Sequence, residues 1–275
     1  MKQMKHIKKL WFAAMISSIA LLGACSSQAK SDEKEKGSAS KVQTIVVGTG
    51  TQFPNVCFID KNGKLTGYDV EIVRAIDKKL PEYKFKFKTM EFSNLLLSLQ
   101  TKKIDLIAHQ MEVNKERQEK FLFNKEPYNV FPLKVTVFKG NNDIKSINDL
   151  KGKKVSVTAT SNSAVFIEDY NKKHNLGAKI VYGSSSADSN EQLKKGRIDA
   201  LISTPFAVDF NNKHVDAQQK VVGDALLNSK VYFLLNKDET TLSNRIDEAL
   251  KELKKEGVVS KLSKKWLGAD YSVDF

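Results

Sequence analysis

The sequence predicts an α/β fold built from two successive strand–helix units. Residues 44–108 alternate short apolar runs, typical of strands buried on both faces, with amphipathic stretches of helical period. Residues 154–203 repeat this order of elements. In each unit polar residues follow the carboxyl end of an apolar strand, which is where open α/β sheets bind ligands. The sequence therefore predicts both a fold class and the place of a ligand site.

The first unit reads as strand, helix, strand, helix, strand. Its first helix follows Asp69, which we predict as the cap, and ends at Pro81 because proline cannot continue a helix. Phe85 and Phe87 alternate with lysines in the middle strand. The predicted strands are 44–48, 83–90 and 104–108, and the predicted helices are 70–80 and 91–99.

The second unit follows a long strand that leads away from the first. Its polar loop, 158–163 (TATSNS), enters a helix, and Thr204-Pro205-Phe206 stands at the end of its last strand. Gly257 closes the final helix. The predicted strands are 131–138, 154–157, 180–182, 198–203 and 231–235, and the predicted helical segments are 147–152, about 165–170, 188–195 and 242–255.

The stretch 104–117 (IDLIAHQMEVNKER) combines a buried strand, a polar turn and the start of a helix. Asn114 is a suitable helix cap, and Arg117 lies in the first turn after it. The polar turn falls where the strand should leave the sheet. We predict that this turn forms half of a small-molecule site and that Arg117 binds an anion there.

The composition favours a globular protein without nucleic-acid or metal chemistry. The chain has 275 residues, of which 41% are hydrophobic, and a formal net charge of +13. Four lysines and no acids lie among residues 1–24, which leaves +9 for the remainder. Basic and acidic residues interleave, and no aromatic-studded basic motif is present, so no nucleic-acid partner is predicted. Metal-ligand spacing, a nucleophile elbow and a phosphate-binding glycine loop are also missing from the sequence, so we predict no cofactor and no metal.

The beginning of the chain predicts export. Residues 1–24 have a lysine-rich start and an apolar run too short to span a bilayer, the pattern of a signal peptide. Leu22-Gly23-Ala24-Cys25 resembles the bacterial lipobox, which implies a mature chain that begins at a lipid-modified Cys25. Residues 25–41, rich in Ser, Lys and Glu, predict a flexible tether to the extracytoplasmic face of a cell membrane of Gram-positive type. Cys57 is then a lone thiol, which we predict to be buried and inert.

Seven segments together resemble the family 3 solute-binding proteins, which deliver polar amino acids to ABC importers. They are spread over nearly all of residues 42–275: VGTGTQFP, GKLTGYDVEIVRAI, FSNLLLSL, IDLIAHQMEVNKER, NDLKGKKVSV, GRIDALIS and LSKKWLGAD. The segments FSNLLLSLQTKKIDLIAHQME and KFLFNKEPYN are most similar to the L-cystine-binding branch.

The resemblance implies a two-lobed fold of the type II periplasmic-binding-protein kind. Each lobe would hold a mixed, mainly parallel sheet with flanking helices, and two crossover strands would form a hinge. Residues 42–131 and 228–275 would make the first lobe, and residues 132–227 the second. The lobes would close on a polar amino acid, with L-cystine favoured, and a monomer would present it to an ABC permease in the membrane.

The resemblance also implies which residues contact the ligand. Phe53 and Phe92 match aromatic positions that sandwich the ligand side chain. Gln110 and Glu112 match positions whose backbone groups meet the α-carboxylate and α-amine, and Arg117 matches the arginine that pairs with the carboxylate. In the second lobe four residues match a loop whose amides and hydroxyls complete the carboxylate cradle at a helix N-terminus. These four are Thr160, Ser161, Asn162 and Ser163.

Five positions depart from the family pattern. Gly50 stands where many members have an acidic residue, and Thr204 where many have the aspartate that binds the α-amine. Glu112 replaces a serine or threonine, and His109-Gln110 replaces Ala-Gly. The ammonium group would therefore be bound by Glu112 or by hydroxyls and carbonyls, and we include His109 and Thr204 among the predicted ligand-binding residues. Extra polar groups in the first lobe suit a ligand with two amino-acid ends, such as cystine.

Two other functions remain open at this point. Dehydratase and transglycosylase domains use a similar scaffold, and an enzyme would need an acid or base in the cleft, for which His109 and Glu112 are the candidates. A sensory or adhesive lipoprotein would use the same fold. The sequence favours the transport reading, and we predict no catalytic residues.

Overall fold

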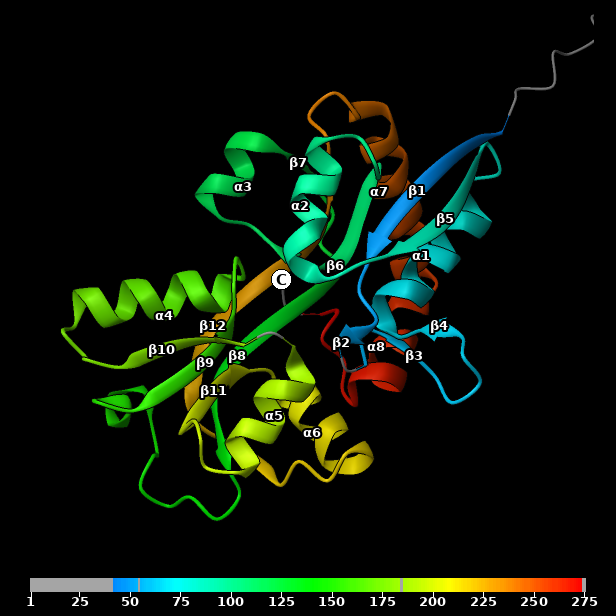
Figure 1. The fold of residues 1–275 in the computed structure, drawn as a ribbon. Helices are drawn as coiled ribbons and strands as arrows, with labels where there is room; N and C mark the ends of the chain where they lie inside the picture. The colour runs from blue at the N-terminus through cyan, green and yellow to red at the C-terminus, as the bar shows by residue number, and fades with distance from the viewer. Residues whose placement is uncertain (1–41, 54, 184, 274–275) are drawn as a thin grey trace, which may run out of the picture. The chain divides into compact units, whose positions relative to one another are not determined.

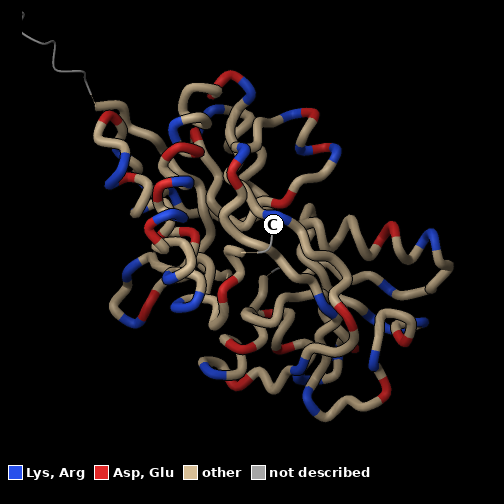
Figure 2. The backbone as a smooth tube through the Cα atoms, turned by 180° about the vertical axis from the view of Figure 1, so that it is seen from behind, with Lys and Arg blue, Asp and Glu red and all other residues tan. Residues whose placement is uncertain are grey.

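The computed structural model describes residues 42–53, 55–183 and 185–273 (Figure 1). The predicted signal peptide, the predicted lipidation site Cys25 and the predicted tether, residues 25–41, all lie outside the described residues. Within the described ranges, no helix combines the length and the apolar character needed to cross a membrane. Figure 2 shows that basic and acidic residues are interspersed along the described backbone.

A mixed sheet organises the described part of the chain, with strand order β10-β9-β11-β8-β12-β6-β1-β5 and β7 paired to β12. A small antiparallel sheet, β2-β3-β4, lies apart from it. The strands of the large sheet are β1 Gln43–Thr49, β5 Tyr83–Thr89, β6 Leu106–Glu112, β7 Leu122–Phe123, β8 Asn129–Phe138, β9 Lys154–Thr158, β10 Lys179–Gly183, β11 Ala200–Ser203 and β12 Gln219–Leu235. Those of the small sheet are β2 Gln52–Phe53, β3 Cys57–Ile59 and β4 Leu65–Thr66.

Helices flank the large sheet on both faces (Figure 1). Helices α1, α7 and α8 share one apolar cluster with β1, whereas α2 packs in a different cluster with β6. The helices are α1 Tyr68–Lys79, α2 Phe92–Gln100, α3 Lys115–Lys120, α4 Asn162–Lys173, α5 Ser186–Lys194, α6 Pro205–His214, α7 Thr240–Lys255 and α8 Val258–Leu267, with a 3-10 turn η1 at Ile147–Leu150.

The pairing directions divide the sheet into two parallel groups joined by long antiparallel strands. β1 pairs in parallel with β5 and β6, and β9 pairs in parallel with β10 and β11. Between the groups, β8 and β12 run antiparallel to each other, with a register shift between Val222 and Leu227. The predicted mixed, mainly parallel α/β fold with two crossover strands is confirmed.

The apolar core is also divided. One set of clusters packs around β1, β5 and β6, and another packs around β9 and β11. Phe131, on β8, packs against both the first set and the second. A crossover strand thus contributes to both cores.

Several element predictions need correction. Asp69 is not a cap: α1 is preceded by Gly67, no side chain caps it, and Asp69 is buried in its first turn. The predicted strand 231–235 is the end of the much longer β12. Helices α6 and α8 were not predicted. Thr204 caps α6 with Pro205 at its first position, and Gly257 starts α8 as well as ending α7.

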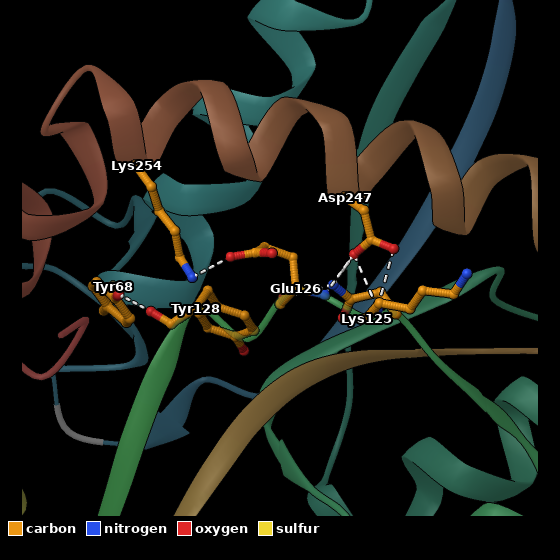
Figure 3. A network of polar contacts seen from close by, with 7 residues as sticks. Tyr68, Lys125, Glu126, Tyr128, Asp247 and Lys254 are labelled. Atoms are coloured by element: carbon orange, nitrogen blue, oxygen red, sulfur yellow. Dashed lines mark hydrogen bonds and ion pairs between the residues drawn. The ribbon is translucent and has the colours of Figure 1, made fainter. Parts of the chain in front are cut away.

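A polar network attaches the loop before β8 to helix α7 (Figure 3). The Asp247 carboxylate accepts hydrogen bonds from the backbone N–H groups of Lys125 and Glu126 and from Asn124 Nδ2. Glu126 in turn pairs with Lys254 at 2.6 Å. These contacts fix where the chain enters its first crossover strand.

Candidate functional site

A cavity of about 400 Å³ lies where β6 and β9 end. Its size is within the range of small-molecule sites, which is roughly 300–1,000 Å³. Every residue of the predicted ligand set lines it except Thr160. The predicted residues that line it are Phe53, Phe92, His109, Gln110, Glu112, Arg117, Ser161, Asn162, Ser163 and Thr204. The fold therefore brings together side chains from both parallel groups of the sheet.

Arg117 is buried at the cavity wall, with only 3% of its surface exposed. The Asn114 side chain caps α3 by accepting from the Arg117 backbone N–H. The guanidinium reaches back to Glu112, at the end of β6. Nη1 donates to the Glu112 carbonyl at 2.8 Å and Nη2 to the Thr160 carbonyl at 3.1 Å. Within the described residues Nε has no hydrogen-bond partner. The carboxylates of Glu112 and Glu116 attract this cation, but its hydrogen bonds go to carbonyls, which leaves Nε for an anionic ligand.

The start of α4 faces Arg117. Ser161 caps this helix by accepting from the Ala164 N–H, and its hydroxyl lies 2.7 Å from that of Ser163. Asn114 Nδ2 donates to Asn162 Oδ1 at 2.7 Å, and so joins the caps of α3 and α4. Thr160 has a φ of 63°, and its carbonyl accepts from Arg117. A helix N-terminus next to a guanidinium is a favourable place for a carboxylate.

The two predicted aromatic walls contact His109. The imidazole centroid lies 5.2 Å from that of Phe53 and 5.0 Å from that of Phe92. Burial lowers the pKa of His109 to about 4, so the ring is neutral at neutral pH. Phe53 and Phe92 thus line the cavity and also hold a third ring, which the sequence did not indicate.

Gln110 is held by a buried network that sequence reasoning missed. Its backbone N–H donates to Asp69 Oδ2 at 2.7 Å, and its side chain donates to Asp69 Oδ1 and accepts from Asn129. The Tyr128 hydroxyl donates to Asp69 Oδ2 at 2.8 Å. Burial raises the pKa of Asp69 to about 6. The Gln110 N–H, which we expected to face the ligand, is bonded to Asp69 instead.

Glu112 and Thr204 place an acid and a hydroxyl at the cavity. The Glu112 carbonyl accepts from Arg117, so this backbone group is already engaged. The carboxylate has hydrogen bonds with the Ser229 and Asn162 side chains and keeps one oxygen for a ligand. Oε1 of this side chain is buried and has no hydrogen-bond partner among the described residues. Thr204 Oγ1 accepts from the Ala207 N–H as the α6 cap, and no hydrogen bond to a described residue uses its hydroxyl hydrogen.

The raised pKa of Glu112 predicts a pH effect on stability. Burial raises this pKa from 4.5 to about 7. The folded state therefore binds the Glu112 proton more tightly than the unfolded state does, which stabilises the fold below pH 4.5. This contribution to the free energy of unfolding is lost as the pH rises from 4.5 to 7. The lowered pKa of His109 acts in the opposite direction, because its contribution is lost as the pH falls from 6.5 toward 4. A comparison with a Glu112 variant is therefore needed to separate the contribution of Glu112 to stability from that of His109.

We expect Glu112→Gln, which does not ionise, to gain stability relative to the wild type as the pH rises from 4.5 to 7.5. The gain should be on the order of 3 kcal/mol, since one pKa unit corresponds to about 1.4 kcal/mol. Urea unfolding of both proteins at four pH values between these limits measures it. A difference that stays constant with pH would contradict a buried, destabilised carboxylate at this position.

Further lining residues were missed by sequence reasoning. Ser185 and Ser186, which begin α5, line the cavity as a second capped helix start. Phe131 and Leu133 contribute from the crossover strand β8. The serine run 184–186 is rich in hydroxyl side chains, as is the loop before α4, and this shared feature of the sequence could have indicated the second helix start.

Cys57 lies close to this region but does not line the cavity. It is fully buried, and burial raises the pKa of its thiol to about 12. The prediction of a buried thiol is confirmed.

The described residues contain no cluster of three or more His, Cys, Asp or Glu side chains that could hold a metal ion.

Comparisons with known proteins agree with this site. Residues 45–269 match the model of the bacterial extracellular solute-binding proteins, family 3. The chain is 53% identical to the L-cystine-binding protein TcyK of Bacillus subtilis and 50% identical to TcyJ of the same organism, in both cases over 96% of this chain and 97% of the relative.

Solved structures show the same likeness. A structure from Listeria monocytogenes, provisionally assigned as an L-cystine ABC transporter, superposes with a TM-score of 0.80 at 60% identity, over 84% of this chain and 99% of that one. An ancestral arginine-binding protein bound to arginine superposes with a TM-score of 0.75 at 34% identity, over 82% of this chain and 99% of that one. These relatives are binding proteins and transport components, in agreement with the prediction that this chain is not an enzyme. The chain belongs to the bacterial extracellular solute-binding proteins of family 3.

Proposed function

We propose that this protein captures a polar amino acid, with L-cystine favoured, and delivers it to the permease of an ABC importer. The observation that carries the proposal is the buried Arg117, which lies next to the capped start of α4 at the wall of a cavity of about 400 Å³. This arrangement fits a ligand carboxylate between a guanidinium and a helix N-terminus. The L-cystine-binding proteins of Bacillus subtilis support the choice of ligand.

Glu112 is the group we assign to the ligand's ammonium. Its carboxylate is buried and lines the cavity, and Oε1 lacks a partner among the described residues. Thr204, which also lines the cavity, offers only a hydroxyl. An ammonium group would stabilise the ionised form of Glu112 by a charge-assisted hydrogen bond. The sequence left two groups open for the ammonium, either Glu112 or hydroxyls and carbonyls. We therefore prefer Glu112.

Closure of two lobes is the proposed mode of capture. Residues 42–131 with 228–275 form the proposed first lobe, and residues 132–227 the second. The divided apolar core and the two long strands β8 and β12 between the parallel groups support this division. Closure would exclude water from the cavity and strengthen its charge-assisted hydrogen bonds.

The proposed location is the extracytoplasmic face of a cell membrane, where a monomer would be held by lipid on Cys25. This part of the proposal rests on the signal-peptide pattern and the lipobox-like residues 22–25. The family's extracellular character supports an exported protein.

A thermal-shift screen of the common amino acids and L-cystine tests the ligand. We expect L-cystine to raise the melting temperature more than glutamine, histidine or arginine does, because at equal concentration a ligand with a lower Kd for the folded state stabilises it more. Calorimetric titration of the best ligand then gives its stoichiometry. A screen in which arginine or histidine gives the largest shift would overturn the choice of cystine.

A further inference from the structure

Gly50 and His109 are in direct contact at the cavity. A Cβ atom placed on Gly50 would lie 2.7 Å from Nε2 and 3.1 Å from Cδ2 of His109, closer than such contacts normally allow. The φ of Gly50 is outside the left-handed region that favours glycine, so its backbone would accept a side chain. The imidazole is the group that excludes one.

The imidazole is held in this place by packing. Phe53 and Phe92 contact it with ring planes tilted by 38° and 44°, and only 8% of the His109 surface is exposed. Nδ1 makes no hydrogen bond to the other described residues. The ring has a hydrogen bond with its own backbone, and its faces are packed by the two phenylalanines, so it is held in place beside Gly50 and fills that space.

Gly50, Phe53, Phe92 and His109 all line the cavity. Loss of the imidazole would open the space between the two phenylalanines and the glycine to the ligand. We propose that Gly50 and His109 act as one size-selecting unit, in which the imidazole fills the space beside the glycine and limits the length of the ligand side chain. The ring faces suit an uncharged, polarisable segment such as a thioether or disulfide.

A double-mutant cycle on stability tests the steric part without any ligand. We expect Gly50→Ala to lower the free energy of unfolding, because a methyl group forced against a packed ring is destabilising. In a His109→Ala background the same substitution should lose most of this effect. The control is Gly140→Ala, whose Cβ would approach only the Phe138 ring, at 3.2 Å, and which should add independently to His109→Ala. Additive effects of the Gly50 and His109 substitutions would overturn the steric unit.

Binding of two disulfides of different length tests the selection, which rests on the proposed function. L-homocystine has the same ends as L-cystine and one more methylene on each side. We expect the wild type to prefer L-cystine and His109→Ala to shift the affinity ratio toward L-homocystine by about tenfold, the size expected for a methylene in a fitted pocket. Gly50→Ala should weaken both ligands, and adding His109→Ala should restore binding.

The outcomes separate the two proposals. If the wild type binds L-cystine but His109→Ala leaves the ratio unchanged, the size-selecting role is wrong while the proposed function stands. If the wild type binds neither disulfide nor any common amino acid, the proposed function is wrong. The stability cycle then still decides whether Gly50 and His109 are coupled.

Discussion

Arg117→Ala should reduce amino-acid binding by at least about a hundredfold. The guanidinium is buried, and its Nε has no partner among the described residues, so we expect a ligand carboxylate to complete its hydrogen bonding. Removing one partner of a buried charge pair costs about 2–5 kcal/mol, and roughly 2.7 kcal/mol corresponds to a hundredfold. Calorimetric titration with the ligand found by the thermal screen measures the loss.

Two further variants make this result specific. Arg117→Lys keeps the charge but not the forked donors, so we expect it to recover only a small part of the affinity. Arg197→Ala removes an exposed arginine that does not line the cavity and should bind as the wild type does. Circular dichroism should show that Arg117→Ala remains folded. Near-normal affinity in folded Arg117→Ala would contradict the assignment of this site.

Asp69→Ala should give the largest loss of stability, roughly 3–5 kcal/mol. The carboxylate accepts from the Gln110 N–H, the Gln110 side chain and the Tyr128 hydroxyl, and it is completely buried. Its removal leaves three buried donors without an acceptor, each of which loses its hydration without compensation. Urea unfolding at neutral pH measures the change.

The comparison variants separate this network from ordinary helix effects. Tyr128→Phe removes one donor and leaves the carboxylate bonded to Gln110, so its loss should be about 1 kcal/mol. Asp77→Ala, on the same helix, removes a partly exposed carboxylate that pairs with Lys84 and accepts from the Phe85 N–H, and it should cost less than Asp69→Ala because only one backbone donor loses its acceptor. A loss below about 1 kcal/mol for Asp69→Ala would show that the network does not hold the fold together.

The sequence predicted those parts of the fold that depend on local pattern. Apolar runs and helical periodicity located the parallel strands and most helices, since burial on both faces or on one face leaves a direct trace in residue order. Asn114 and Arg117 were predictable for a related reason. A cap and a side chain three residues later have a fixed relation in any helix, so the position of the guanidinium follows from the turn.

Contacts between residues distant in the sequence could not be predicted in this way. Asp69 looked like a helix cap because its side chain and position allow capping, but burial against Gln110, 41 residues away, gave it another role. Gln110 has a φ of 50° inside a buried strand, which no local propensity indicates. The packing of His109 over Gly50 likewise depends on two strands meeting in the folded sheet.

The burial of Cys57 has a chemical consequence for a protein that would carry a disulfide. A thiol attacks a disulfide only as the thiolate, and a pKa of about 12 leaves roughly one thiolate in a hundred thousand molecules at neutral pH. The sulfur also does not line the cavity where such a ligand would bind. A reactive cysteine there would form a mixed disulfide and retain its cargo. With its cysteine chemically silent, the protein would release the proposed disulfide ligand intact.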